Sequence, residues 1–139
     1  MEVFLLKKKV IIVVIVGLIL LFPIMRNAFN EIMTPDKVLV VGHQVSEHTF
    51  EFTKEIKDKE KIVDFENIFD QVNFSTEEWD VVAYPDIIVQ INHKKGIFTH
   101  AFHIWIKGEE GIVLIWTLEE KLIGRLSSSQ MKALQEIIH

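Results

Sequence analysis

Six histidines are the side chains best suited to metal or proton chemistry in this chain of 139 residues, which has no cysteine. They are His43, His48, His93, His100, His103 and His139. On a β-strand a separation of three places His100 and His103 on opposite faces, so the two cannot share an ion there. No His-Glu-x-x-His pattern sets two ligands on one helical face. We therefore expect no metal site.

Two further groups of residues could in principle carry catalysis. Glu77, Glu78 and Asp80 flank Trp79, and paired carboxylates are the groups that hydrolyse glycosides. Adjacent acids in a polar loop are more often simply solvated. The serines at 127–129 precede an amphipathic segment, where helix capping is the stronger explanation, and no Gly-x-Ser-x-Gly elbow or Gly-rich phosphate loop is present. The residues favour a protein that is not an enzyme and holds no cofactor.

The spacing of apolar residues predicts the elements that position these side chains. An apolar run ended by Gly42 and a period-two alternation predict two strands, and a three- and four-residue spacing predicts a helix capped by Asp58. Four more strands are separated by short breaks typical of hairpins, and a capping box of Ser127 with Gln130 begins a closing helix. The predicted ranges are 38–41, 50–56, 58–73 (helix), 87–93, 97–107, 112–118, 121–126 and 127–139 (helix).

This order of elements, ββαββββα, defines an α+β domain in which two helices pack on an antiparallel meander. If Lys107 pairs with Ile112 across a four-residue turn, Trp105 lies opposite Leu114 and His103 lies opposite Trp116. Cross-strand pairs of this kind stabilise a sheet.

Alternation along the meander strands sorts their side chains into two faces. The drier face, which we expect to receive the helices, carries Ile87, Val89, Ile91, Ala101, His103, Trp105, Leu114, Trp116, Leu118, Leu122 and Leu126. The mixed face carries Ile88, Gln90, Asn92, Phe98, His100, Phe102, Ile104, Ile106, Val113, Ile115, Thr117, Ile123 and Arg125.

The mixed face would leave a large apolar patch if nothing covered it, and such patches mark interaction sites. The alternative is that other strands or a helix close over the patch and make it core. Together with the loop tryptophan, its central residues are our candidate partner contacts: Trp79, Phe102, Ile104 and Ile106.

The N-terminal segment has the composition of a membrane-spanning or signal helix rather than that of a folded domain. Residues 10–25 carry no charge, and as a helix they extend about 24 Å, against about 30 Å for the apolar core of a bilayer. A cleaved signal is the alternative, but Ala28 is the only small residue after the run and Arg26 lies two positions before it, which disfavours cleavage. Three lysines precede the run and only Arg26 closely follows it, so the positive-inside rule places the N-terminus in the cytoplasm.

The chain thus divides into a cytoplasmic N-terminus (1–9), a transmembrane anchor in contact with lipid (10–25), a linker (26–37) and an extracytoplasmic domain (38–139). This domain carries 10 Lys and Arg against 17 Asp and Glu, a net charge of -7. So acidic a domain is not expected to bind nucleic acid.

Residues 56–139 resemble the YhfM-like domain of small exported or membrane-attached proteins of Bacillus and relatives. The resemblance rests on the apolar helix around residues 62–72, Tyr84-Pro85-Asp86 before a strand, Ile104-Trp105-Ile106, and the end from Leu126-Ser127 to Ile138. It implies a membrane-attached or exported domain of this fold. The family is a domain of unknown function, so it supplies no catalytic residues.

These observations favour a single-pass membrane protein whose outer domain binds or senses a ligand, with a protein partner at the cell envelope as one such ligand. Two alternatives stay open. One is an envelope hydrolase that uses an acid or histidine site, and the other is a structural subunit of a membrane assembly.

The orientation predicts the behaviour of a reporter fusion. An alkaline phosphatase joined after His139 should be active in cells, because the enzyme works only outside the cytoplasm and the lysines hold the N-terminus inside. A fusion that is expressed but inactive would contradict the orientation.

Overall fold

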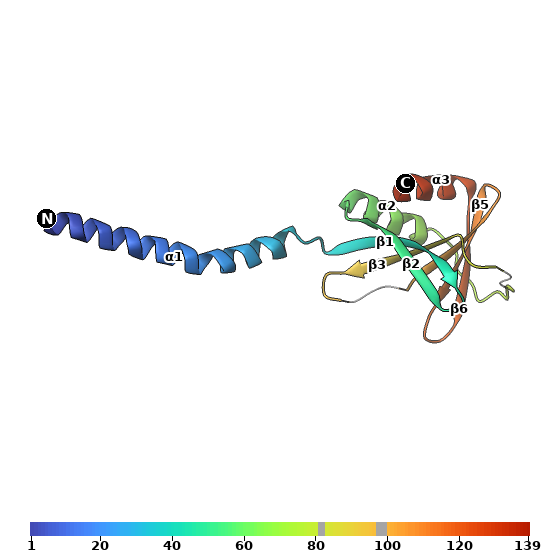
Figure 1. Cartoon of the computed structure of the whole chain (residues 1–139). Coiled ribbons are helices and arrows are strands. Elements are labelled where there is room, and N and C mark those ends of the chain that lie inside the picture. The colour runs from blue at the N-terminus through green and yellow to red at the C-terminus, as the bar shows by residue number, and fades with distance from the viewer. Residues whose placement is uncertain (81–82, 97–99) are drawn as a thin grey trace. The chain divides into compact units, whose positions relative to one another are not determined.

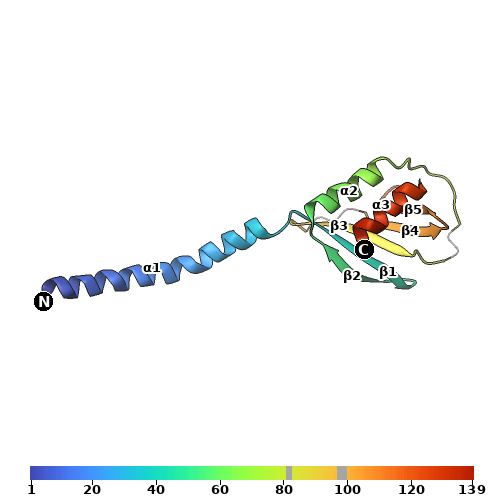
Figure 2. The ribbon, with the colours of Figure 1, turned by 90° about the horizontal axis from the view of Figure 1, so that it is seen from above.

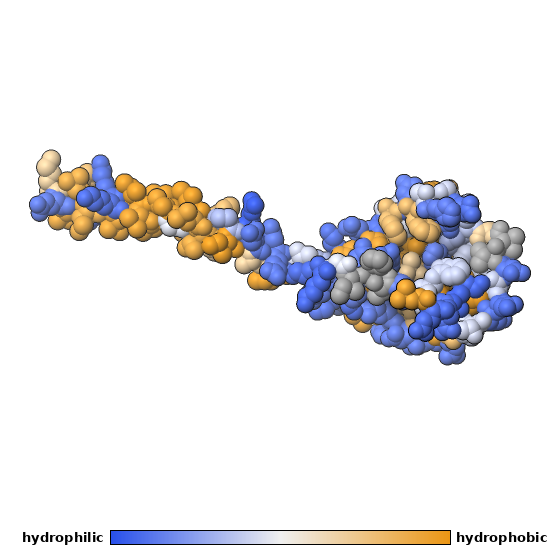
Figure 3. All heavy atoms as spheres, turned by 90° about the horizontal axis from the view of Figure 1, so that it is seen from below, coloured by the Kyte–Doolittle hydropathy of each residue, from blue (hydrophilic) through white to orange (hydrophobic). Residues whose placement is uncertain are grey.

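The computed structural model describes residues 1–80, 83–96 and 100–139, and the chain forms two units, Met1–Thr34 and Pro35–His139 (Figure 1). The first unit is one helix, α1 (Glu2–Met33), with Pro23 inside it and no buried residue. Hydrophobic residues coat most of α1, whereas the visible surface of the second unit is mostly hydrophilic (Figure 3). The length and composition of α1 fit a membrane-spanning helix and equally a signal sequence. The helix also includes residues 26–33 of the expected linker.

The second unit is an α+β domain with one antiparallel sheet and two helices, which confirms the predicted class. Along the sheet the strands lie in the order β2-β1-β3-β4-β5-β6. The first residues of the predicted strand 97–107, Phe98 among them, lie outside the described residues. The elements are β1 (Lys37–Ser46), β2 (Thr49–Ile56), α2 (Lys59–Asp70), β3 (Ile87–His93), β4 (Phe102–Lys107), β5 (Glu110–Trp116), β6 (Lys121–Leu126) and α3 (Ser128–Ile138).

Both helices of the domain begin at the predicted caps. The Asp58 carboxylate accepts the backbone N–H groups of Glu60 and Lys61, and Ser127 forms a reciprocal capping box with Gln130. Each cap satisfies N–H groups that a helix start leaves unpaired. The helices lie over the same face of the sheet (Figure 2), and their apolar stripes enter a single core. The buried helix residues are Ile62, Phe65, Ile68, Phe69, Met131, Leu134, Ile137 and Ile138.

The face beneath the helices differs from the predicted one on two strands. In the β3–β4 ladder Val89 pairs with Phe102 and Ile87 with Ile104, and residues paired across a ladder point to the same side. The core therefore combines β3 residues from the expected drier face with Phe102, Ile104 and Val113 from the other. The prediction was wrong for β4 and β5. Alternation orders side chains within a strand, but only the pairing register relates one strand to the next.

The β4–β5 hairpin is tighter than predicted. Lys107 pairs with Glu110 rather than with Ile112, so that Trp105 lies opposite Ile112 and His103 opposite Leu114. The two-residue turn begins at Gly108, which has a φ of 65°, a value open to glycine at little cost. Positive φ at the first turn residue alone is the pattern of a type II′ turn, whose twist suits a two-residue hairpin.

Strand β1 continues through Gly42, where a strand end was predicted. A Cβ atom at this position would collide with the backbone carbonyl of Glu51, so only glycine lets the two strands approach here. The register shifts at this point, and Thr53 is left without a partner in the ladder. The resulting bulge sends Phe50 and Phe52 to the helix-free face, whereas Lys54 and Ile56 stay on the helix side. The predicted alternation had placed all four on one face.

Two isoleucines of β4 differ in burial and therefore allow a matched comparison of substitutions. The side chain of Ile104 is fully buried beneath the helices, whereas Ile106, on the same face of the same strand, is 37% exposed. Ile104→Ala should lower the free energy of unfolding by about 2–5 kcal/mol, since it leaves a cavity in the core.

Ile106→Ala should cost no more than about 1 kcal/mol. Urea denaturation of residues 35–139, which contain the whole core, measures both changes. Equal losses for the two variants would contradict the burial of Ile104.

Candidate functional site

The helix-free face of the sheet is covered in part by the loop between α2 and β3. Trp79 of this loop packs edge-on against Trp105, with ring centroids 4.8 Å apart, and joins a small second core with Leu114 and Ile123. The Trp105 Nε1–H donates to the backbone oxygen of Ala83 at 2.9 Å. These contacts hold the loop against one part of the face and leave the rest open.

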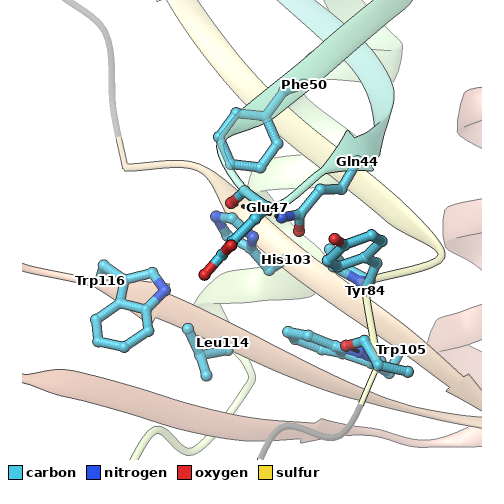
Figure 4. Close-up of a pocket in the computed structure, with 10 residues that line it drawn as sticks. Gln44, Glu47, Phe50, Tyr84, His103, Trp105, Leu114 and Trp116 are labelled. Carbon is cyan, nitrogen blue, oxygen red and sulfur yellow. Dashed lines mark hydrogen bonds between the residues drawn. The ribbon is translucent and has the colours of Figure 1, made fainter.

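A pocket of about 920 Å³ occupies the open part. Its walls come from three places in the sequence: the β1–β2 hairpin, the end of the loop before β3, and strands β4 and β5 (Figure 4). The lining residues are Gln44, Glu47, Phe50, Ala83, Tyr84, Pro85, His103, Trp105, Leu114 and Trp116. Five of these ten are aromatic or imidazole rings, as is common in ligand-binding pockets.

Three aromatic rings of the pocket keep much of their surface in water. Phe50, Tyr84 and Trp116 are 44%, 52% and 57% exposed. The bulge in β2 directs Phe50 into the pocket, and its ring meets the His103 ring edge-on at 5.7 Å. The rings come from separate elements and are arranged around one space (Figure 4).

His103 lies among the rings of the pocket. Burial lowers the pKa of His103 below its ordinary value of 6.5, because desolvation disfavours the charged imidazolium. At neutral pH the ring is therefore neutral and presents one N–H donor and one nitrogen acceptor. Its ring is also stacked with that of Trp105, with centroids 6.5 Å apart and an angle of 23° between the ring planes.

Two opposite charges stand near the pocket. In Figure 4 the Glu47 carboxylate extends from the hairpin toward the space between His103 and Trp116. The Lys121 ammonium lies 5.7 Å from the centre of the Trp116 ring and donates to the backbone oxygen of Trp79 at 3.3 Å. The pocket is therefore an apolar hollow with one acid and one base at its edges.

None of the four predicted contact residues lines this pocket. Phe102 packs on Phe65 and Phe69 of α2, and Ile104 is fully buried. The apolar patch that would mark an open interaction face is thus closed by the helices, which is the alternative that the sequence left open. Ile106 lies at the edge of the core and Trp79 packs on Trp105, and neither residue is among those that line the pocket.

The acids and histidines considered for catalysis are dispersed. Glu77 pairs with Arg125 at 3.4 Å on the surface, and His100 is exposed and precedes β4. Within residues 1–80, 83–96 and 100–139, no three His, Asp or Glu side chains are grouped as ligands for a metal ion. Of the six histidines and the acids Glu77, Glu78 and Asp80, His103 alone lines the pocket in the described part of the chain.

Fold and site together define a small α+β domain with a helix-backed antiparallel sheet and an aromatic pocket on its helix-free face. Residues 36–139 match the model of a family described as YhfM protein. The chain belongs to this family, as its resemblance predicted. No curated protein and no solved structure matches the chain.

Sequence reasoning missed most of the pocket, although part of the signal was present. Alternation correctly grouped His103, Trp105, Leu114 and Trp116 on one face, but that face was assigned to the helices. Phe50 was grouped with Ile56, and no pattern indicated the bulge that separates them. Tyr84 lies in an irregular segment whose position depends on the hydrogen bond that Trp105 makes to Ala83.

The lowered pKa of His103 predicts a pH dependence of stability. Below about pH 6.5 the His103 imidazole is protonated in the unfolded chain but stays neutral in the folded chain until the pH is lower. The free energy of unfolding should therefore fall as the pH is lowered from about 7 to 5. His103→Gln should reduce this fall.

The matched control is His48→Gln, which removes an exposed histidine of the hairpin turn and should keep the original slope. Denaturant titrations at several pH values measure the effect. An unchanged slope in His103→Gln would refute the link to burial.

Proposed function

We propose that this protein is a single-pass membrane protein whose C-terminal domain binds a ligand in the aromatic pocket, on the extracytoplasmic side. The observation that carries the proposal is the pocket itself, with half-exposed rings held by separate elements. Aromatic side chains left in water lose the benefit of burial, so their collection around one hollow favours a binding role.

The length and apolar composition of α1 support the membrane part of the proposal. The helix has no buried residue, and its apolar side chains are exposed along its length. A lipid bilayer provides the apolar environment that such a helix requires. The lysines at positions 7–9 support an N-terminus in the cytoplasm and a domain outside.

Crosslinking in intact cells tests binding at the pocket. The photo-reactive amino acid p-benzoylphenylalanine, which keeps an aromatic ring in place of Trp116 of the full chain, should give crosslinked products, because this side chain lies at the pocket and is 57% exposed. The matched control position is Val63, which is 48% exposed on α2 in the helix layer.

A second substitution, Phe50→Ala, should reduce the products formed at position 116 and leave those at position 63 unchanged. Gel shifts and mass spectrometry record the products. Equal crosslinking at the two positions, or none at position 116, would refute a binding role for the pocket.

A further inference from the structure

We propose that the aromatic pocket binds a neutral saccharide, with sugar rings packed on its exposed aromatic side chains. This inference rests on the proposed function and adds the chemical class of the ligand. It follows from three properties of the pocket: its ring surfaces, its unused hydrogen-bonding groups and its charges.

The ring surfaces suit a sugar. A pyranose ring has one face formed mainly by C–H groups, and this face packs flat on an aromatic ring while the hydroxyl groups point outward. Phe50, Tyr84 and Trp116 offer three such rings around one space, all about half exposed. Trp116 is the most accessible of the three and has the largest ring, so we assign it the main stacking role.

The hydrogen-bonding groups of the pocket suit hydroxyls. Each hydroxyl both donates and accepts, so a sugar needs donors and acceptors interspersed. The pocket offers the Tyr84 hydroxyl, the Trp116 Nε1–H and the His103 imidazole, which makes one donor and one acceptor available when neutral. No hydrogen bond from these three groups to another protein group occurs in the described part of the chain, so they are available to a ligand.

The charges favour a neutral ligand. The Glu47 carboxylate has no ion pair among the described residues and would repel an anion, as would the domain's net charge of -7. The Lys121 ammonium already lies near the Trp116 ring and would repel a cation that sought the same ring. A neutral polyhydroxylated ligand avoids both repulsions, and both charged groups can hydrogen-bond its hydroxyls.

Titration of the full chain in lipid nanodiscs, free of glycoside detergents, tests the proposal. The probes are two neutral tetramers, one of β-1,4-linked N-acetylglucosamine and one of β-1,4-linked glucose, with choline and inorganic phosphate as charged comparisons. The readout is the Trp116 indole N–H resonance of tryptophan-labelled protein, assigned by its loss in Trp116→Phe. We expect a saturable shift with at least one tetramer and none with choline or phosphate.

Variants test the stacking role. Trp116→Ala should weaken tetramer binding about tenfold, whereas Trp116→Phe should keep most of the affinity, measured for both by saturation-transfer NMR on the sugar. Leu118→Ala is the matched control, since Leu118 is fully exposed in the β5–β6 turn and does not line the pocket. Equal weakening by Leu118→Ala, or an unchanged affinity in Trp116→Ala, would overturn the assigned site.

The outcomes separate this inference from the proposed function. Absence of any shift with both tetramers overturns the saccharide class, while crosslinks at position 116 would still support a binding pocket. A shift with choline and none with the tetramers overturns it in favour of a cationic ligand. If none of the four probes shifts the Trp116 indole N–H resonance and no crosslinks form at position 116, both proposals are refuted.

Discussion

The pairing of β3 with β4 is the constraint on which the rest of the domain depends. Val89 opposite Phe102 and Ile87 opposite Ile104 give the sheet one continuous apolar face, which α2 and α3 bury. The same register sends His103 and Trp105 to the other side. A shift by one residue would exchange the two sets, exposing Ile104 to water and placing the imidazole of His103 beneath the helices. Core and pocket are therefore two results of one register.

Two local irregularities shape the open side of the sheet. Gly42 lets β1 and β2 approach closely at the bulge, and the bulge turns Phe50 toward His103. On the other side, the loop carrying Trp79 and Tyr84 is held by the hydrogen bond from Trp105 to Ala83. The pocket lies between these two features. The positions of its rings thus depend on the backbone geometry of the bulge, on the buried indole of Trp105 and on the contact between the Phe50 and His103 rings.

Much of the domain's architecture could be predicted from its sequence, since local signals are strong there. Asp58 and the Ser127–Gln130 box identify both helix starts, because capping involves residues within three positions of each other. Alternation also grouped His103 with Trp105 and Trp116, since side-chain direction within a strand follows from the backbone alone. The relation of that group to β3 could not be predicted. It depends on the register in which β3 pairs with β4, and the periodicity within each strand contains no information about that register.

By itself the sequence determined that a charge-free apolar segment follows three lysines near the N-terminus. It also determined that the rest of the chain is an acidic α+β domain of the YhfM family. These properties depend on composition and on short-range spacing. Only the tertiary structure decided that Phe102 and Ile104 are core and that Phe50, Tyr84, His103 and Trp116 share a pocket. The last four residues come from four separate segments of the chain. What brings them together is strand register, a bulge and a loop contact, which are long-range interactions that no local pattern records.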